Sequence, residues 1–195
     1  MENNNQQHIF FMKEALKEAQ KAYLKEEVPI GAIAVLNQKI IARAHNNRNT
    51  KKLFFGHAEF LALIKAGKKI NSRFLNDVSL YVTLEPCLMC TGAIIQAGIK
   101  NLYYGTSIEK SYSFNDMSSI QNMPFMDKLN IQSGLLAQES IQLLKKFFQE
   151  LRIKKIIYYP NKKIKKCNKT ITTLITTQLD HHNRWSFIFK KIICQ

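Results

Sequence analysis

The chain has 195 residues, of which 46% are hydrophobic, and its formal net charge is +15 at pH 7. This length suits one globular domain with room for an appendage, and no run of about 18 apolar residues offers a membrane span. The charge indicates a polyanionic partner, nucleic acid first and a membrane surface second, although a simple solvated basic surface would look the same.

The N-terminal seven residues lack the basic start and the apolar core of a signal peptide. The chain has four cysteines, two of them in the metal site proposed below, which do not make a disulfide framework. A metal–thiolate site suits a reducing compartment. The sequence therefore predicts a cytoplasmic protein.

The first predicted element is an amphipathic helix, because apolar residues from Ile9 to Tyr23 recur at helical spacing. A buried strand is predicted for residues 28–36. A two-residue turn then leads to a second strand over residues 39–44, so that the two strands form a hairpin. A polar, basic loop over residues 45–52 follows, for which simple solvation is the alternative to a role in binding.

The second helix is predicted to begin at about His57 and to end at Gly67. A strand over residues 78–84, a helix over residues 87–98 and a strand over residues 102–104 come next. Strands that alternate with helices of this length need crossover connections and at least partly parallel pairing. The expected fold is α/β, with helices on both faces of a small mixed sheet.

Residues 107–127 have no clear period and are read as a loop over the site. A closing helix is predicted for residues 135–152, which ends the main domain of residues 1–152. Residues 153–195 form a basic extension with a net charge of +9, either a nucleic-acid-binding arm or a partly disordered tail. A second metal site is not predicted in this extension, because no compact spacing joins its possible ligands, which are His181, His182 and Cys194.

The chemistry of the chain is concentrated in two short motifs: His57-Ala58-Glu59 and, thirty residues on, Cys87-Leu88-Met89-Cys90. One imidazole and two thiolates are zinc ligands, and three protein ligands leave a fourth position for water. Zinc lowers the pKa of that water towards about 7. Glu59 is then the expected catalytic residue, since a carboxylate beside such a water can carry protons as general base and acid.

Both motifs are predicted to lie at helix starts. Pro86 follows an apolar strand and suits a first helical turn, where the dipole and free N–H groups favour the thiolates of Cys87 and Cys90. His57 and Glu59 are two residues apart and would diverge inside a helix. They can share a site only if the helix begins at about His57.

An alternative is that the two cysteines are buried small residues or half of a structural zinc knot. A knot needs four ligands, and the remaining cysteines, Cys167 and Cys194, lie in the extension. The catalytic interpretation is therefore preferred, since both motifs are present in order.

With these motifs in place, residues 9–152 resemble the bacterial tRNA-specific adenosine deaminases of the TadA type, within the cytidine deaminase-like superfamily. The likeness rests on residues 28–32, 57–59 and 80–93. His-x-Glu followed by Pro-Cys-x-x-Cys is the signature of zinc-dependent nucleobase deaminases. The run Ile108-Glu109-Lys110-Ser111-Tyr112 departs from the family, which usually has Asp-x-Lys-x-Gly there and contacts RNA with it.

The resemblance implies a three-layer α/β/α fold with a mixed five-stranded sheet, a homodimer and one Zn²⁺ per subunit. It also implies a hydrolase of tRNA processing that binds the anticodon stem-loop and converts adenosine to inosine at the wobble position. Carried over by position, the metal ligands are His57, Cys87 and Cys90, and Glu59 is the proton shuttle. The implied substrate-binding residues are Asn46, Ala58, Val28 and Leu84, with Ile30 either in the pocket wall or in the core.

Two other functions remain compatible with the sequence. A free guanine or cytosine-type deaminase of the same superfamily would share the zinc chemistry without needing a basic surface. A zinc-stabilised RNA-binding protein would have the ligands but no use for Glu59.

Overall fold

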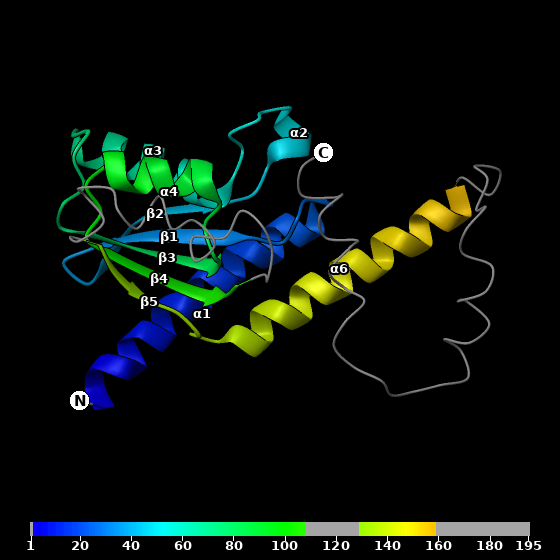
Figure 1. The fold of residues 1–195 in the computed structure, drawn as a ribbon, viewed down its shortest axis with the longest axis horizontal. Helices are drawn as coiled ribbons and strands as arrows, with labels where there is room; N and C mark the ends of the chain where they lie inside the picture. Colours follow the sequence, from blue (N-terminus) through cyan, green and yellow to red (C-terminus); the bar gives the residue numbers. More distant parts are fainter. Residues whose placement is uncertain (1, 108–128, 159–195) are drawn as a thin grey trace. The chain divides into compact units, whose positions relative to one another are not determined.

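The computed structural model describes residues 2–107 and 129–158. The chain divides into two compact units, residues 1–147 and 148–195. The first unit contains a five-stranded sheet of order β2-β1-β3-β4-β5 (Figure 1). The strands are β1 Gly31–Leu36, β2 Lys39–His45, β3 Val78–Leu84, β4 Asn101–Thr106 and β5 Asn130–Gln132.

The sheet is mixed, as predicted. β1 pairs antiparallel with β2 and with β3, whereas β3 pairs parallel with β4 and β4 with β5. The hairpin turn is made by Asn37 and Gln38, both of which have positive φ, as a tight turn between right-twisted strands requires. The fifth strand, β5, is short and exposed along its length, so its sequence carried no alternating pattern.

The helices of the described residues cover both faces of the sheet. Figure 1 shows α3 and α4 on one face and α1 on the other. The helices are α1 Glu2–Leu24, α2 Arg48–Lys51, α3 Ala58–Ile70, α4 Leu88–Gln96 and α6 Ala137–Tyr158. No helix within the described ranges is both long enough and apolar enough to cross a membrane.

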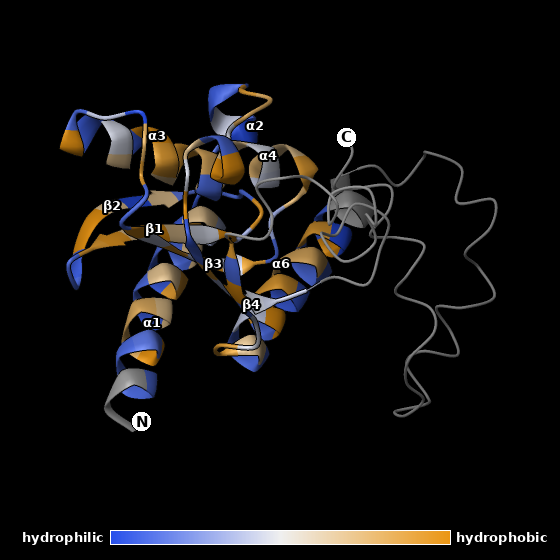
Figure 2. Cartoon of the chain, turned by 60° about the vertical axis from the view of Figure 1, so that its left-hand side comes forward, coloured by the Kyte–Doolittle hydropathy of each residue, from blue (hydrophilic) through white to orange (hydrophobic). Residues whose placement is uncertain are grey.

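Side chains along β1 alternate between the two faces, as the two-residue period of a strand dictates. Ala32 and Ala34 join the core under α3 and α4, whereas Ile33 and Val35 join the core under α1. In Figure 2, α1 carries both hydrophilic and hydrophobic colours along its length, which fits a helix with one face on the sheet. The core under α3 is rich in alanine: Ala42, Ala44, Ala58, Ala62 and Ala66 are all buried there.

Several predicted boundaries were wrong by a few residues. β4 is longer at both ends than the predicted strand over residues 102–104, and α6 begins at Ala137 and runs to Tyr158, whereas the closing helix was predicted for residues 135–152. β1 begins at Gly31 because the Ile30 N–H donates to the Val28 carbonyl in a tight turn (2.7 Å). The predicted loop over residues 45–52 begins one residue later and contains the single helical turn α2. α3 continues past Gly67 and ends before Asn71, whose left-handed backbone (φ 54°) closes it.

Some predictions fall outside the described residues. They are the loop over residues 107–127, apart from Ser107, and the extension beyond residue 158 with its His181, His182 and Cys194. The proposed domain boundary at residue 152 stays a prediction.

Candidate metal centre and active site

The site lies where two helices begin, and the N-cap residue of each helix is a candidate metal ligand. His57 is the N-cap of α3 (φ −80°, ψ 145°) and Cys87 is the N-cap of α4 (φ −73°, ψ 169°). The His57 carbonyl accepts the Leu61 N–H (3.0 Å), so the first helical hydrogen bond starts there. His57 is therefore extended while Glu59 is helical, which confirms the predicted helix start that lets the two share a site.

The three ligand candidates converge. His57 Nδ1 lies 3.5 Å from the sulfur of Cys87 and 3.5 Å from that of Cys90. The three ligand atoms all lie within 4.8 Å of one another. A tetrahedral zinc with Zn–N of about 2.05 Å and Zn–S of about 2.3 Å requires nitrogen and sulfur about 3.6 Å apart. The donor set therefore fits a zinc ion by both chemistry and spacing.

The electrostatics of the metal-free protein favour a thiolate at Cys87. Its pKa falls to about 4, because Cys90 and then His57 hydrogen-bond to it, against the opposing effect of burial. The hydrogen bond with Cys87, followed by burial, raises the pKa of Cys90. The pKa of His57 is raised chiefly by its hydrogen bond with Cys87. Metal binding needs a deprotonated sulfur, and the site already supplies one.

Glu59 is a buried carboxyl group in the first turn of α3, with only 3% of its surface exposed. Burial raises its pKa to about 7, although the nearby His57 works in the opposite direction. Its Oε2 atom is buried and accepts no hydrogen bond from the described residues. A proton carrier near neutrality, with one oxygen unused, can serve as both general base and general acid.

Asn46, the predicted base-binding residue, is also buried with an unused polar atom. It is 5% exposed, its backbone N–H donates to the Ile30 carbonyl (3.0 Å), and its side-chain Oδ1 has no hydrogen-bond partner within the described ranges. A buried amide oxygen without a partner is costly unless a ligand supplies the donor. Asn46 therefore has the chemistry of a substrate contact.

The other predicted pocket residues lie at the start of α3, at the end of β3 and in the turn before β1. Ala58 is fully buried at the start of α3, and Leu84 is buried at the end of β3, three residues before Cys87. Val28 and Ile30 are half-buried in the turn that precedes β1. Ile30 packs against the core under α3, so its packing role is the one the structure shows.

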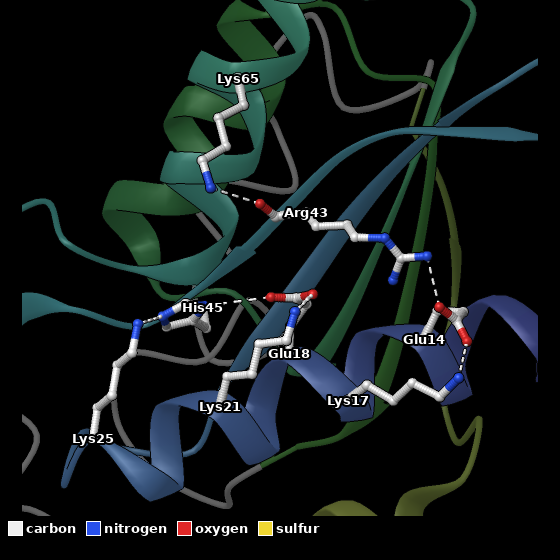
Figure 3. A network of polar contacts seen from close by, with 8 residues as sticks. All are labelled: Glu14, Lys17, Glu18, Lys21, Lys25, Arg43, His45 and Lys65. Atoms are coloured by element: carbon white, nitrogen blue, oxygen red, sulfur yellow. Dashed lines mark hydrogen bonds and ion pairs between the residues drawn. The ribbon is translucent and has the colours of Figure 1, made fainter.

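A polar network fixes the strand end that carries Asn46. His45 Nδ1 faces Glu18 Oε2 of α1 (3.4 Å), and His45 Nε2 accepts from Lys25 Nζ (3.0 Å), as Figure 3 shows. An acceptor Nε2 and a donor Nδ1 describe a neutral imidazole. Burial, the largest cause, accordingly lowers the pKa of His45. A neighbouring bridge joins Arg43 to Glu14 (2.6 Å), so α1 holds β2 in place just before the site.

Sequence reasoning missed two buried supports of the site. The Glu27 carboxylate is fully buried and accepts the backbone N–H of Thr50. This hydrogen bond anchors residues 46–56, which are called the site loop, to the residue before Val28. Thr83 Oγ1 accepts the Gly31 N–H (3.1 Å) inside the sheet. Glu27 stands in the polar run Lys25-Glu26-Glu27, which looks like an ordinary exposed turn, so no signal marked it.

A mixed five-stranded sheet with helices on both faces, together with a His-Cys-Cys donor set and an adjacent buried glutamate, defines a deaminase of the cytidine deaminase-like class. The family described as MafB19-like deaminase matches residues 4–152.

Individual proteins narrow this class. The chain is 43% identical over 150 residues to a tRNA-specific adenosine deaminase of Bacillus subtilis, covering 76% of this chain and 93% of that one. It is 42% identical over 144 residues to one from Rickettsia felis, covering 72% and 100%. A solved structure from a study of A-to-I editing by tRNA:A34 deaminases superposes with a TM-score of 0.65 at 37% identity, covering 69% of this chain and 99% of that one. The chain belongs to the family of tRNA-specific adenosine deaminases.

Proposed function

We propose that this protein hydrolyses adenosine to inosine at the wobble position of a tRNA anticodon, with one zinc ion per subunit. The observation that carries this proposal is the convergence of His57, Cys87 and Cys90 beside the buried carboxyl of Glu59. The net charge of +15 suits an RNA substrate. Because that substrate is tRNA and the site uses thiolates, the protein is expected in the cytoplasm.

The reaction adds water to the ring carbon that bears the amino group and expels ammonia. His57, Cys87 and Cys90 would hold the zinc ion, which would supply Lewis-acid activation of the attacking water. Glu59 takes a proton from that water and gives it to the ring nitrogen beside the reacting carbon, while the oxygen bonds to that carbon. Glu59 then takes the proton of the new hydroxyl group and gives it to the amine, so that the C–N bond breaks, ammonia leaves and the carbonyl of inosine forms. In the protein without metal, burial raises the pKa of Glu59 to about 7, which suits a group that both accepts and releases protons.

The base is held by the elements around the metal. Asn46 hydrogen-bonds the polar edge of the base through its unused side-chain oxygen, and the backbone at Ala58 contacts the same edge. Val28 and Leu84 form apolar walls. A base flipped out of a single-stranded loop costs little unstacking, which suits an anticodon loop.

The direct test is to incubate the purified protein with total tRNA and to sequence for A-to-I changes. We expect conversion confined to first anticodon positions that carry adenosine. Turnover of free bases or nucleosides, with none on an anticodon stem-loop, would favour the free-base deaminases instead.

A second test separates an enzyme from a zinc-stabilised RNA-binding protein. Glu59→Ala is expected to keep zinc and tRNA binding while abolishing inosine formation, because only the proton carrier is removed. Undiminished activity in this variant would contradict the proton-shuttle role.

The basic extension is proposed to add tRNA affinity through phosphate contacts. Deleting residues 153–195 removes a net charge of +9 and is expected to weaken tRNA binding at raised salt while leaving the deaminase domain folded. Binding measured across a salt series tests this, with thermal unfolding as the control. Equal salt slopes for the two chains would show that the extension is not an electrostatic arm.

We also propose that the protein is a homodimer that pairs through the outer face of α3 and α4. A groove of about 530 Å³ runs between these helices, lined among others by Phe60, Leu63, Ile64, Met89 and Ala93. Ile64 of α3 and Leu88, the first residue of α4, are 38% and 42% exposed. Apolar surface of this kind is typical of subunit interfaces.

Ile64→Glu is expected to convert the dimer to a monomer in sedimentation experiments, because it places a charge in the interface. Leu24→Glu is the matched control, since Leu24 is 73% exposed at the end of α1 on the other face of the sheet. Equal sedimentation of both variants with the wild type would place the contact elsewhere.

A further inference from the structure

The site loop, residues 46–56, displays a large aromatic side chain beside the active site. Phe54 is 74% exposed, the largest exposed fraction of any large hydrophobic residue among the residues described. Isolated exposed apolar residues are common on proteins and need no explanation by themselves. Phe54 differs because of how it is supported, what surrounds it and where it stands.

Phe54 is supported from behind by other rings. It meets Phe55 edge to face, with ring centroids 5.0 Å apart and planes at 86°. Phe55 in turn lies 5.7 Å from Phe60, which belongs to α3. Aromatic pairs of this geometry restrict ring motion and leave the outer face free for another ring. Phe54 is thus an exposed ring on a rigid base.

The loop that carries Phe54 is itself held at both ends. The Asn47 N–H donates to the Gly56 carbonyl (2.9 Å), which closes the base of the loop. Gly56 is packed so tightly that a Cβ there would lie 2.7 Å from Arg48 Cα. Between these ends, the buried Glu27 accepts a hydrogen bond from the Thr50 N–H. The loop that carries the exposed Phe54 ring is therefore anchored by backbone hydrogen bonds and tight packing.

The charged residues of the site loop are all positive. The site loop contains Arg48, Lys51 and Lys52 and no acidic residue. Lys51 and Lys52 are exposed. Figure 2 shows α2 in hydrophilic and neutral colours, with the hydrophobic segment that follows it alongside. An aromatic ring among cations is the combination by which proteins hold single-stranded nucleic acid, where bases stack and phosphates pair with lysine.

The place of Phe54 next to the active site indicates that the RNA substrate is what contacts its exposed ring. The site loop starts at the base-binding candidate Asn46 and leads directly to the metal ligand His57. Phe54 and His57 are three residues apart, so their Cα atoms lie within about 11 Å. That distance is a span of a few nucleotides of single strand.

We propose that Phe54 is a stacking platform for an unpaired base of the RNA that neighbours the reacting adenosine, and that Lys51 and Lys52 hold the adjoining phosphates. The inference rests on the proposed function and specifies one contact within it. It makes the site loop a determinant of which RNA loops enter the site, separate from the residues that perform the deamination.

The test combines a protein change with an RNA change. Phe54→Leu keeps the apolar character but removes the stacking face, and it is expected to raise KM for a synthetic anticodon stem-loop about tenfold with kcat nearly unchanged. Phe54→Tyr should restore the wild-type KM. When the base next to the target is replaced by an abasic nucleotide, placed at each neighbouring loop position in turn, wild type and Phe54→Leu should have equal KM at one of those positions.

Matched controls come from the far ends of other elements. Phe10→Leu removes a ring that is 54% exposed near the N-terminal end of α1 and should leave KM unchanged. Lys51→Gln and Lys52→Gln should each lower the salt slope of RNA binding by about 0.7, the value for one phosphate contact on a single strand. Lys39→Gln, at the opposite end of β2 from the site, should not.

The outcomes separate three possibilities. A wild-type protein that does not deaminate any RNA stem-loop would overturn the proposed function itself. Normal wild-type activity with an unchanged KM in Phe54→Leu, or a KM effect that persists at every abasic position, would overturn only the stacking contact. Dissociation of the dimer by Phe54→Leu in sedimentation experiments would show that the ring binds a second copy of the chain, and would also overturn it.

Discussion

The two helices that build the candidate metal centre have similar N-caps and differ in what their first turns hold. α3 and α4 each have a ligand candidate as N-cap in extended conformation, and neither N-cap side chain caps its own helix by a hydrogen bond. α3 then places Glu59 in its first turn, whereas the first turn of α4 holds Cys90 and no acid. One helix start thus supplies a ligand and a proton carrier, and the other supplies two ligands.

This difference assigns separate tasks to the two helix starts. Both should be needed for the metal, because three donors are shared between them. Only α3 should be needed for proton transfer. Variants placed on one helix at a time can test that division.

The largest effect is expected from the ligands. Cys87→Ala on α4 and His57→Ala on α3 should each lose zinc and all measurable deamination, because two donors no longer hold the ion firmly. Metal analysis of the purified variants and inosine assays would check this. Full zinc occupancy in either variant would show that the ion has another ligand.

The next effect concerns the stability of the metal-free protein and its pH dependence. The folded pKa of Glu59 is raised to about 7 from 4.5, so the fold disfavours its ionised form. The resulting penalty is absent below about pH 4.5, grows as the pH rises, and is complete above about 7. It amounts to roughly 3 kcal/mol for a shift of this size. In chelator, Glu59→Gln should therefore unfold like the wild type near pH 4.5 but be more stable by that amount at pH 8.

Urea unfolding of both proteins at the two pH values measures this difference. The start of α4 should contribute no such pH dependence to the stability, because its first turn has no carboxyl group to titrate. Parallel stability curves for the two proteins would mean that Glu59 reaches water before it ionises.

The sequence was sufficient to predict where the two helices of the candidate site begin, because its local signals agree. Pro86 after an apolar strand marks the start of α4, and the two-residue spacing of His57 and Glu59 itself demands a helix boundary between them. The hairpin and strand β3 were predicted within one or two residues, apart from the start of β1. The three predicted ligands converge in the structure, and their role in binding zinc stays a prediction. Residue roles carried over from the resemblance, such as those of Val28 and Leu84, stay predictions.

The rest depended on contacts between distant residues. Glu27 looks like part of an exposed turn until the fold buries it against Thr50 of the site loop. α3 runs past Gly67 because a helix ends where a residue adopts a left-handed backbone, and that residue is Asn71. β5 is three exposed residues whose strand character comes only from pairing with β4. No local pattern contains that information.

A smaller effect is expected from the glycine that precedes α3. Gly56→Ala should destabilise the protein by about 1 to 3 kcal/mol and raise KM, because the new methyl group meets the backbone of Arg48. Gly92→Ala in α4 is the control within one subunit: nothing of the same chain lies within 4 Å of its added Cβ, so it should stabilise the monomeric Ile64→Glu background by up to about 1 kcal/mol. Equal changes in melting temperature for the two variants would mean that the site loop adjusts to the added methyl group without loss of stability.

The smallest effect should come from the far end of α3. Asn71 has φ 54°, a conformation that asparagine tolerates better than alanine. Asn71→Ala should therefore cost about 1 kcal/mol or less in thermal unfolding, without change in KM, kcat or zinc content. Gly98, two residues after the end of α4, offers the sharper counterpart. It has φ 74°, and a Cβ there would also meet the side chain of Asn76, so Gly98→Ala should cost more. If either change altered kcat, the chemistry would depend on whole helices and not only on where they begin.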